Sequence, residues 1–138
     1  MPTQIKLEVV TQERMVVSEL VEEVTVPGLD GELGVLPEHT YLMSLLQTGV
    51  LSYRIHHERK VLAVSGGYLE VRPDRVTVLA EVAERPEEID VERARLARDR
   101  ALQQVKESGS EIELTAATAR MQRAINRLHV AGRGAELG

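Results

Sequence analysis

Arginine side chains recur through the last third of the chain at a spacing that could gather them on one edge of a helical pair. If Ala94 and Ala101 in one helix and Leu114 in the next share a heptad position, the arginines fall beside that seam. Like charges crowded on one flank repel each other, and guanidinium groups suit bidentate phosphate binding. The pattern predicts a site for a polyanionic ligand or an acidic partner, with a solvated basic edge balanced by nearby carboxylates as the alternative. The arginines concerned are Arg93, Arg100, Arg120 and Arg127, with Arg123 beside them.

The other side chains that could do chemistry are scattered. None of the four histidines lies at metal-ligand spacing from a suitable partner, and His56-His57 is expected at a hairpin tip. Gly66-Gly67 lacks the Lys-Ser/Thr that follows in a phosphate-binding loop, and no nucleophile motif is present. The sequence therefore predicts a non-enzymatic protein that holds no metal. A cupin-like metal enzyme would require histidines clustered inside a barrel.

Two helices are expected to position the arginines. Asp90 is placed to cap the first helix, which should end near Ser108-Gly109 with the glycine left-handed. Ser110 and Glu113 form a capping box for the second helix, and the tail after Val130 is expected to fray. The two form an antiparallel hairpin that should dock on the rest of the chain or on a partner. Its seam comprises Ala94, Ala97, Ala101, Leu114, Ala117, Met121, Ala124, Leu128 and Ala131.

The part of the chain before Pro86 reads as short strands. Alternation or β-branched runs occur at residues 5–10, 22–26, 49–55, 60–65, 68–71 and 75–80, with Pro73-Asp74 as a turn. Residues 27–51 combine four of the ten glycines and two of the five prolines with many leucines, which predicts short buried strands joined by sharp turns. Strands at this spacing predict an antiparallel sandwich or barrel.

Composition limits the class of protein. The 138 residues suffice for one domain with an appendage, and a core must be built from aliphatic side chains because aromatic residues make up only 2%. The absence of cysteine excludes disulfides, and a net charge of −5 disfavours general nucleic-acid binding. No run is apolar enough to span a membrane, and no targeting segment is evident, so a soluble cytosolic-type protein is expected.

Charge divides the chain into two parts. Residues 1–85 carry 8 basic and 13 acidic side chains, whereas residues 86–138 carry 9 of each. This asymmetry, together with the change of period at Pro86, predicts two units with different tasks: a β domain at 1–85 and a helical hairpin at 86–138.

Several ordered motifs resemble one known family. Pro-Gly-Leu-Asp-Gly-Glu-Leu-Gly-Val-Leu-Pro-Glu-His at 27–39, Ser-Gly-Gly-Tyr-Leu-Glu-Val at 65–71, Val-Thr-Val-Leu-Ala at 76–80, Ile-Asp-Val-Glu-Arg-Ala at 89–94 and Arg-Ala-Ile-Asn-Arg-Leu at 123–128 are similar to the epsilon subunit of bacterial F-type ATP synthase. The resemblance covers nearly the whole chain. It implies an α+β fold: an N-terminal antiparallel β-sandwich of about ten strands followed by an antiparallel α-helical hairpin.

The resemblance also implies a role. The chain would be a non-catalytic rotor subunit, peripheral to the cytoplasmic face of the bacterial plasma membrane, and would couple proton translocation to ATP synthesis. The sandwich would bind the gamma subunit and the c-ring, the latter through Gly31, Glu32, Glu38 and His39. The hairpin would permit turnover when folded onto the sandwich and would inhibit ATP hydrolysis when extended. Its arginines Arg120, Arg123 and Arg127 could then meet the alpha/beta catalytic hexamer.

Some members of that family hold the folded state by binding ATP through an (I/L)DxxRA motif, which is intact at 89–94. By this resemblance the arginines would take the phosphates, while Glu84 and Asp90 would accept from the adenine amino group or ribose hydroxyls. Asp90 also has a sufficient structural role as a helix cap. No cofactor is required, and ATP would act as a regulatory ligand; a free-standing nucleotide-sensing module is the alternative. The implied ATP-binding residues are Glu84, Ile89, Asp90, Arg93, Ala94, Arg100, Arg123 and Arg127.

Overall fold

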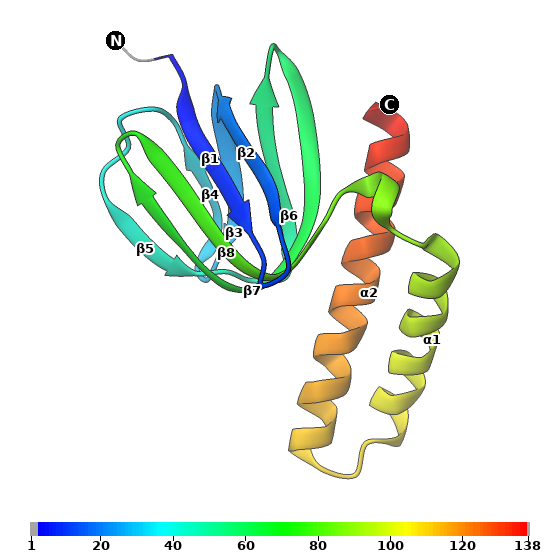
Figure 1. Ribbon diagram of the computed structural model, residues 1–138. Helices are drawn as coiled ribbons and strands as arrows, with labels where there is room; N and C mark the ends of the chain where they lie inside the picture. Colours follow the sequence, from blue (N-terminus) through cyan, green and yellow to red (C-terminus); the bar gives the residue numbers. More distant parts are fainter. Residues whose placement is uncertain (1–2, 138) are drawn as a thin grey trace.

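The computed structural model describes residues 3–137, which form eight strands followed by two long helices (Figure 1). The strands come first and a short 3-10 turn, η1, joins them to the helices. In chain order the elements are β1 Ile5–Val10, β2 Met15–Val21, β3 Glu23–Gly28, β4 Gly31–Val35, β5 Leu42–Leu45, β6 Gly49–Ile55, β7 Glu58–Arg72, β8 Arg75–Glu84, η1 Pro86–Glu88, α1 Val91–Glu107 and α2 Glu111–Leu137.

The strands pair in the order β2-β1-β8-β7-β6-β3-β4 and fold into two facing layers (Figure 1). The first half of β7 pairs with β6, and its second half pairs with β5, so one continuous strand serves both layers. β8 pairs with β7 from Arg75 to Glu84. The β-sandwich and hairpin are therefore confirmed, with eight strands among the described residues instead of about ten because the long strands run through both layers.

One pairing departs from the prediction. β1 and β8 run parallel, with Leu7 opposite Val76 and Val9 opposite Val78, whereas the other strand pairs of the sandwich are antiparallel as expected. Parallel neighbours need a long connection between them. Here almost the entire sandwich lies between β1 and β8, and this distance along the chain hides the pairing from local sequence patterns.

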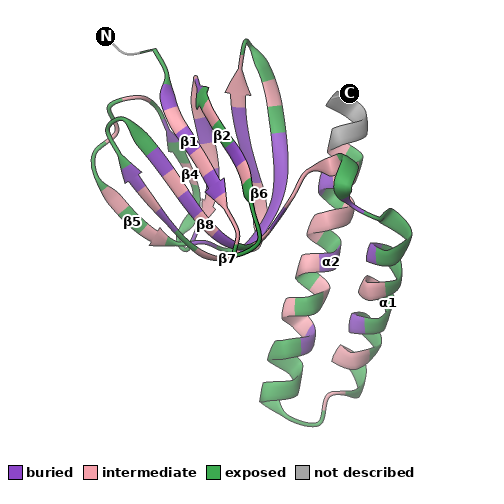
Figure 2. Cartoon of the chain, in the orientation of Figure 1, coloured by how far each residue is buried: buried purple, intermediate pink, exposed green. Residues whose placement is uncertain are grey.

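The sandwich core is aliphatic and arises from period-two alternation. Ile5, Leu7 and Val9 of β1 are fully buried, while the residues between them are half-buried (Figure 2). The same alternation in other strands supplies the opposing layer, and Tyr53 is the one aromatic side chain in this core among the described residues. Burial of these side chains removes apolar surface from water, which is the main favourable term in folding.

The strand predictions were partly correct. The strands expected at 5–10, 49–55 and 75–80 are present, but β2 was not predicted, and residues 60–65 and 68–71 belong to one strand. Gly66 and Gly67 do not end that strand, although both have positive φ, of 70° and 99°. A Cβ on Gly67 would lie 1.9 Å from the Leu79 oxygen, so glycine is required where β7 passes closely over β8. The expected turns at His56-His57 and Pro73-Asp74 are confirmed.

The helix ends follow the sequence with three differences. The Asp90 carboxylate accepts from the Arg93 amide at 3.1 Å, which confirms the cap of α1. The Glu113 amide donates to the Ser110 hydroxyl, as a capping box requires. The Glu113 carboxylate accepts from the Gly109 amide, one residue before the Ser110 amide that a capping box would use. Gly109 is not left-handed, because Ser108 ends α1 through a bond to Val105. α2 continues to Leu137, so the expected fraying after Val130 is wrong.

The hairpin packs against the sandwich through α2, which lies between the strands and α1 (Figure 1). A small apolar cluster joins Val61 and Ala63 of β7 to Ile89 and Val130. The Asn126 side-chain amide adds a hydrogen bond of 2.8 Å to the Gly49 carbonyl of β6. The hairpin is therefore docked on the sandwich, with a contact much smaller than the sandwich core.

Candidate functional site

Four arginines converge in a groove along one edge of the hairpin. Arg100 comes from α1, and Arg120, Arg123 and Arg127 come from successive turns of α2. We call this the basic groove; its volume is about 340 Å³. The structure thus brings together four of the five arginines that heptad spacing placed on one edge, whereas Arg93 lines a neighbouring pocket. The lining is completed by Ala97, Ala101, Gln104 and Ala124.

A second, mixed-charge pocket lies beside the groove at the start of α1. It contains two arginines, Arg93 and Arg127, together with the carboxylates of Glu84, Glu88 and Asp90, and has a volume of about 190 Å³. We call it the acidic pocket. Arg127 lines both spaces, so a cationic groove and a carboxylate-bearing pocket adjoin at this side chain. Ile89 and Ala94 complete the lining.

The positive charge of the groove is only partly balanced. Arg127 makes an ion pair with Glu84 through Nε and Oε1, 2.6 Å apart, and Arg120 donates to the Gln104 side chain at 3.1 Å. Within the part of the chain that the structure describes, no carboxylate lies within ion-pair distance of Arg100 or Arg123. Clustered guanidinium groups of this kind are well suited to phosphate oxygens, which accept bidentate hydrogen bonds.

Small side chains at the helix interface set the width of the groove. Ala94 and Ala101 of α1 and Ala117 and Ala124 of α2 are almost completely buried, and buried positions lie where the helices face each other (Figure 2). Alanine at the contact lets helix axes approach closely and brings the flanking arginines from both helices together. The predicted seam is confirmed at these four alanines. Leu114, which was also assigned to the seam, is 42% exposed and contributes little to the packing between the helices.

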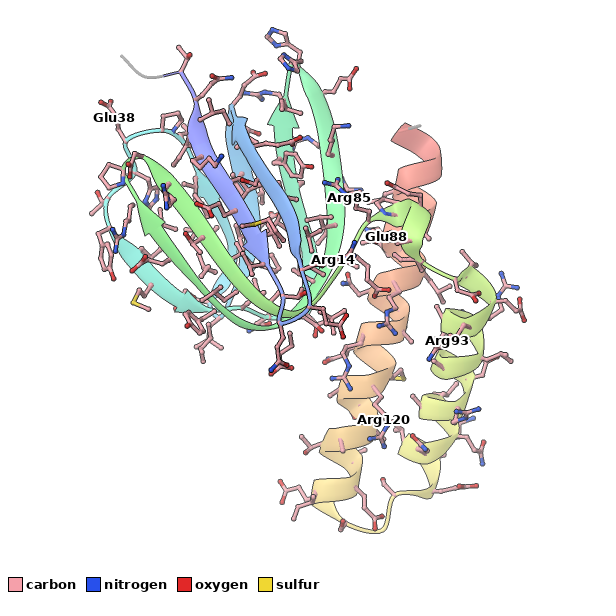
Figure 3. All side chains as sticks on the ribbon, viewed as in Figure 1. Arg14, Glu38, Arg85, Glu88, Arg93 and Arg120 are labelled. Atoms are coloured by element: carbon pink, nitrogen blue, oxygen red, sulfur yellow. The ribbon has the colours of Figure 1, made fainter. Side chains whose placement is uncertain are left out.

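The eight residues implied for ATP binding all line these two spaces. Glu84, at the end of β8, is the one member from the sandwich, and the remaining seven precede or belong to the helices. Figure 3 shows Arg93 and Arg120 on the two helices of the hairpin. The residues implied for binding the catalytic hexamer, Arg120, Arg123 and Arg127, belong to the same groove.

Two lining residues were missed by sequence reasoning. Gln104 lies one helical turn after Arg100 and bonds to Arg120, so an i, i+4 search from the arginines would have found it. Glu88 precedes the helix cap by two residues and has no distinguishing motif. The Arg85 amide, together with the Arg14 guanidinium, holds the pKa of the Glu88 carboxyl below its ordinary value, against the opposing effect of burial.

The residues implied for c-ring contact lie elsewhere. Gly31 and Glu32 begin β4, while Glu38 and His39 lie in the connection before β5. Figure 3 shows Glu38 on the side of the sandwich away from the hairpin. Its φ of 68° is uncommon for a residue with a side chain, and its amide donates to the Pro73 carbonyl at 2.7 Å. The loop is thus tied to the β7–β8 turn with the Glu38 side chain exposed.

Among residues 3–137, no group of three or more histidine or acidic side chains could hold a metal ion. The described helices include none with the length and hydropathy needed to cross a bilayer.

Two protein-family models match consecutive parts of the chain. Residues 4–86 match a model described as ATP synthase, Delta/Epsilon chain, beta-sandwich domain. Residues 87–132 match one described as ATP synthase, Delta/Epsilon chain, long alpha-helix domain. Together the matches cover nearly all described residues.

Relatives named ATP synthase epsilon chain are similar over most of their length. The protein from Syntrophobacter fumaroxidans is 50% identical over 131 residues, which is 95% of this chain and 98% of the relative. The protein from Desulforamulus reducens is 45% identical over 126 residues, or 91% of this chain and 96% of the relative.

Two solved structures have a similar fold. A chain in the OSCP/F1/c-ring structure of the Euglena gracilis mitochondrial ATP synthase matches with a TM-score of 0.80 and 26% identity, covering 91% of this chain and 80% of that one. A chain in the central stalk/c-ring structure of the Tetrahymena thermophila mitochondrial ATP synthase matches with a TM-score of 0.59 and 11% identity, covering 92% and 96%. The latter likeness shows the fold alone.

Proposed function

This chain belongs to the ATP synthase delta/epsilon chain family, and from that premise we propose that it is a non-catalytic central-stalk subunit whose hairpin senses ATP. The sandwich would bind the gamma subunit and the c-ring, and the hairpin would regulate ATP hydrolysis by the alpha/beta hexamer. The complex would hold the chain at the cytoplasmic face of the bacterial plasma membrane, where it helps couple proton translocation to ATP synthesis.

The observation that carries the nucleotide proposal is that the basic groove and the acidic pocket adjoin at Arg127. Arg100, Arg123 and Arg127 would hold the phosphates, since Arg100 and Arg123 have no carboxylate partner among the described residues. At the other end, Glu84 and Asp90 would accept hydrogen bonds from the adenine amino group or the ribose hydroxyls. A molecule with anionic and donor-bearing ends matches this arrangement.

Binding at this site would stabilise the docked hairpin. The groove takes residues from both helices, and the acidic pocket adds Glu84 from the sandwich, so a ligand that contacts all three favours their present arrangement. Without an anion the arginines repel one another, and only a small apolar cluster and few polar bonds hold α2 to the strands. The freed arginines would then be available to acidic residues of the catalytic hexamer.

The sandwich also offers surfaces for partners. Met43 and Leu45 of β5 and Tyr68 of β7 are about half exposed, and Leu45 lies directly opposite Tyr68. Exposed apolar side chains grouped on one sheet face mark an interaction surface, which we assign to the gamma subunit. Gly31, Glu32, Glu38 and His39 would face the c-ring.

Calorimetric titration of the full chain with ATP tests the sensor. We expect saturable 1:1 binding that is lost in the Arg123→Ala/Arg127→Ala variant. The matched control is Arg95→Ala/Arg98→Ala, which removes two arginines of α1 that line neither space and pair with Glu92 and Asp99. Absence of binding at millimolar ATP, or equal loss in the control, would contradict the sensor, and the arginines would then be assigned to the hexamer alone.

A further inference from the structure

The linker between the sandwich and the hairpin is bound to the sandwich by an arginine. The Arg85 guanidinium donates to the Tyr53 hydroxyl of β6 at 3.2 Å and to the Val16 carbonyl of β2 at 3.1 Å. Tyr53 is completely buried in the sandwich core. Arg85 therefore reaches from the end of β8 to two other strands, and its side chain holds the first linker residue in place.

A second set of bonds holds the turn that follows. One Glu88 carboxylate oxygen accepts from the Arg85 amide at 2.8 Å, and the other pairs with the Arg14 guanidinium at 2.7 Å. The Glu88 amide in turn donates to the Arg85 carbonyl at 3.0 Å. Pro86 fixes one backbone torsion between them. Figure 3 shows Arg14, Arg85 and Glu88 at the junction of the sandwich with the hairpin.

Directly after this turn, the side-chain and backbone bonds connect to helix α1 instead of to the strands. Ile89 and Asp90 are both extended, and the Asp90 side chain and carbonyl bond to Arg93 and Ala94 of α1. Asp90 is thus bonded to the helix, whereas Arg85 and Glu88 are bonded to the sandwich, although η1 also packs against α2 in this docked arrangement. The Ile89 amide still donates to the Pro86 carbonyl at 3.2 Å, and its side chain packs in the docking cluster, which would have to separate before the hairpin could turn. Large torsional changes in a few extended residues such as Ile89 and Asp90 are what hinges require.

We propose that Arg14, Arg85 and Glu88 form a clamp that keeps residues 85–88 on the sandwich whenever the hairpin leaves it, so that the hairpin pivots at Ile89 and Asp90. This goes beyond the nucleotide site and applies to any release of the hairpin. The pivot divides the acidic pocket: Glu84 and Glu88 stay with the sandwich, and Asp90, Arg93 and Arg127 leave with the hairpin.

Backbone ¹⁵N relaxation on the full chain, without nucleotide, tests the clamp. Val130→Asp places a carboxylate at a fully buried position of the docking cluster and should release the hairpin. Should that chain fail to fold, Asn126→Ala/Arg127→Ala is the second variant. It removes the bonds from these two side chains of α2 to Gly49 and Glu84 of the strands and leaves the sandwich core unchanged. Release of the hairpin is recognised by a change in the backbone resonances of Val61 and Ala63, which lie under the docked hairpin. The variant that shows this change is used for the relaxation measurements.

In the released chain, residues 85–88 should keep order parameters of about 0.85, as in the strands, while the hairpin reorients independently. Adding Arg85→Gln should lower the values at 85–88 below about 0.6, whereas the matched change Arg95→Gln on exposed α1 should leave them unaltered. Order parameters below about 0.6 at 85–88 on release alone, or no response to Arg85→Gln, would overturn the clamp. Because no ATP is present, neither result depends on nucleotide binding.

Discussion

Some residues of this protein both stabilise the fold and line the proposed nucleotide site. Asp90 caps α1 through the Arg93 amide and also lines the acidic pocket. Arg127 pairs with Glu84 across the junction and lines both spaces. Any loss of ATP binding on replacing these residues therefore needs to be separated from a loss of folding.

Asp90 allows that separation because asparagine caps helices about as well as aspartate. We expect Asp90→Ala to lower the free energy of unfolding by about 1 kcal/mol and Asp90→Asn to change it by only a few tenths. Urea unfolding of the three chains measures this. ATP titration of Asp90→Asn then reports on the carboxylate charge alone. Equal destabilisation by Ala and Asn would contradict the capping role.

At the scale of elements, the hairpin depends on the close approach of its two helices. Ala101 and Ala124 are each about 2% exposed at the interface, and the arginines of the groove flank them. Close approach therefore both stabilises the hairpin and sets the distances between guanidinium groups. The same element is held to the sandwich by a small apolar cluster, which is consistent with the proposed release of the hairpin.

Enlarging the interface should disturb both properties. Ala124→Leu is expected to cost about 1–3 kcal/mol because the added side chain has no space between the helices. ATP binding should weaken at the same time, since the groove would widen. Ala116→Leu, at an exposed position of α2, is the control and should be tolerated. Thermal unfolding and calorimetry measure the two effects; a fully stable Ala124→Leu chain would show that the helices are not closely packed there.

Elements whose apolar residues repeat at a clear local spacing could be predicted from the sequence. Contacts between residues far apart in the chain could not. The heptad spacing of alanines located the helical interface and the arginine edge, and the Asp90 cap located the start of α1. The parallel pairing of β1 with β8 and the bond from Arg85 to Tyr53 join residues far apart in the chain, so no local pattern signals them. β2 was missed because Met15, Ser18 and Leu20 blur its alternation.

On the scale of the whole molecule, the proposed contacts are separated. The basic groove lies on the hairpin, while Glu38 lies on the other side of the sandwich (Figure 3). A ligand at the hairpin therefore leaves the loop at Glu38 and His39 exposed. Under the proposed function, this separation would allow the hairpin to move while the sandwich stays bound to its partners.

Charge reversal at the exposed loop tests this arrangement. Glu38→Lys should weaken binding to membranes that contain the c-ring by about tenfold, because a carboxylate facing the partner is replaced by a cation. ATP titration should be unaltered. The control is Glu58→Lys, the same change at the exposed β6–β7 turn. Co-sedimentation measures the difference, and equal binding by both variants would argue against this loop as the contact.

The continuity of β7 through both layers has a mechanical consequence. In a sandwich whose layers share no strand, interdigitated side chains and connecting loops resist the sliding of one layer over the other. Here β7 pairs with β6 in one layer and with β5 in the other, so shear between the layers would have to stretch a covalent backbone. Under torque from a rotating shaft, the sandwich would twist as one stiff body, and the compliance of the subunit would reside in the hairpin.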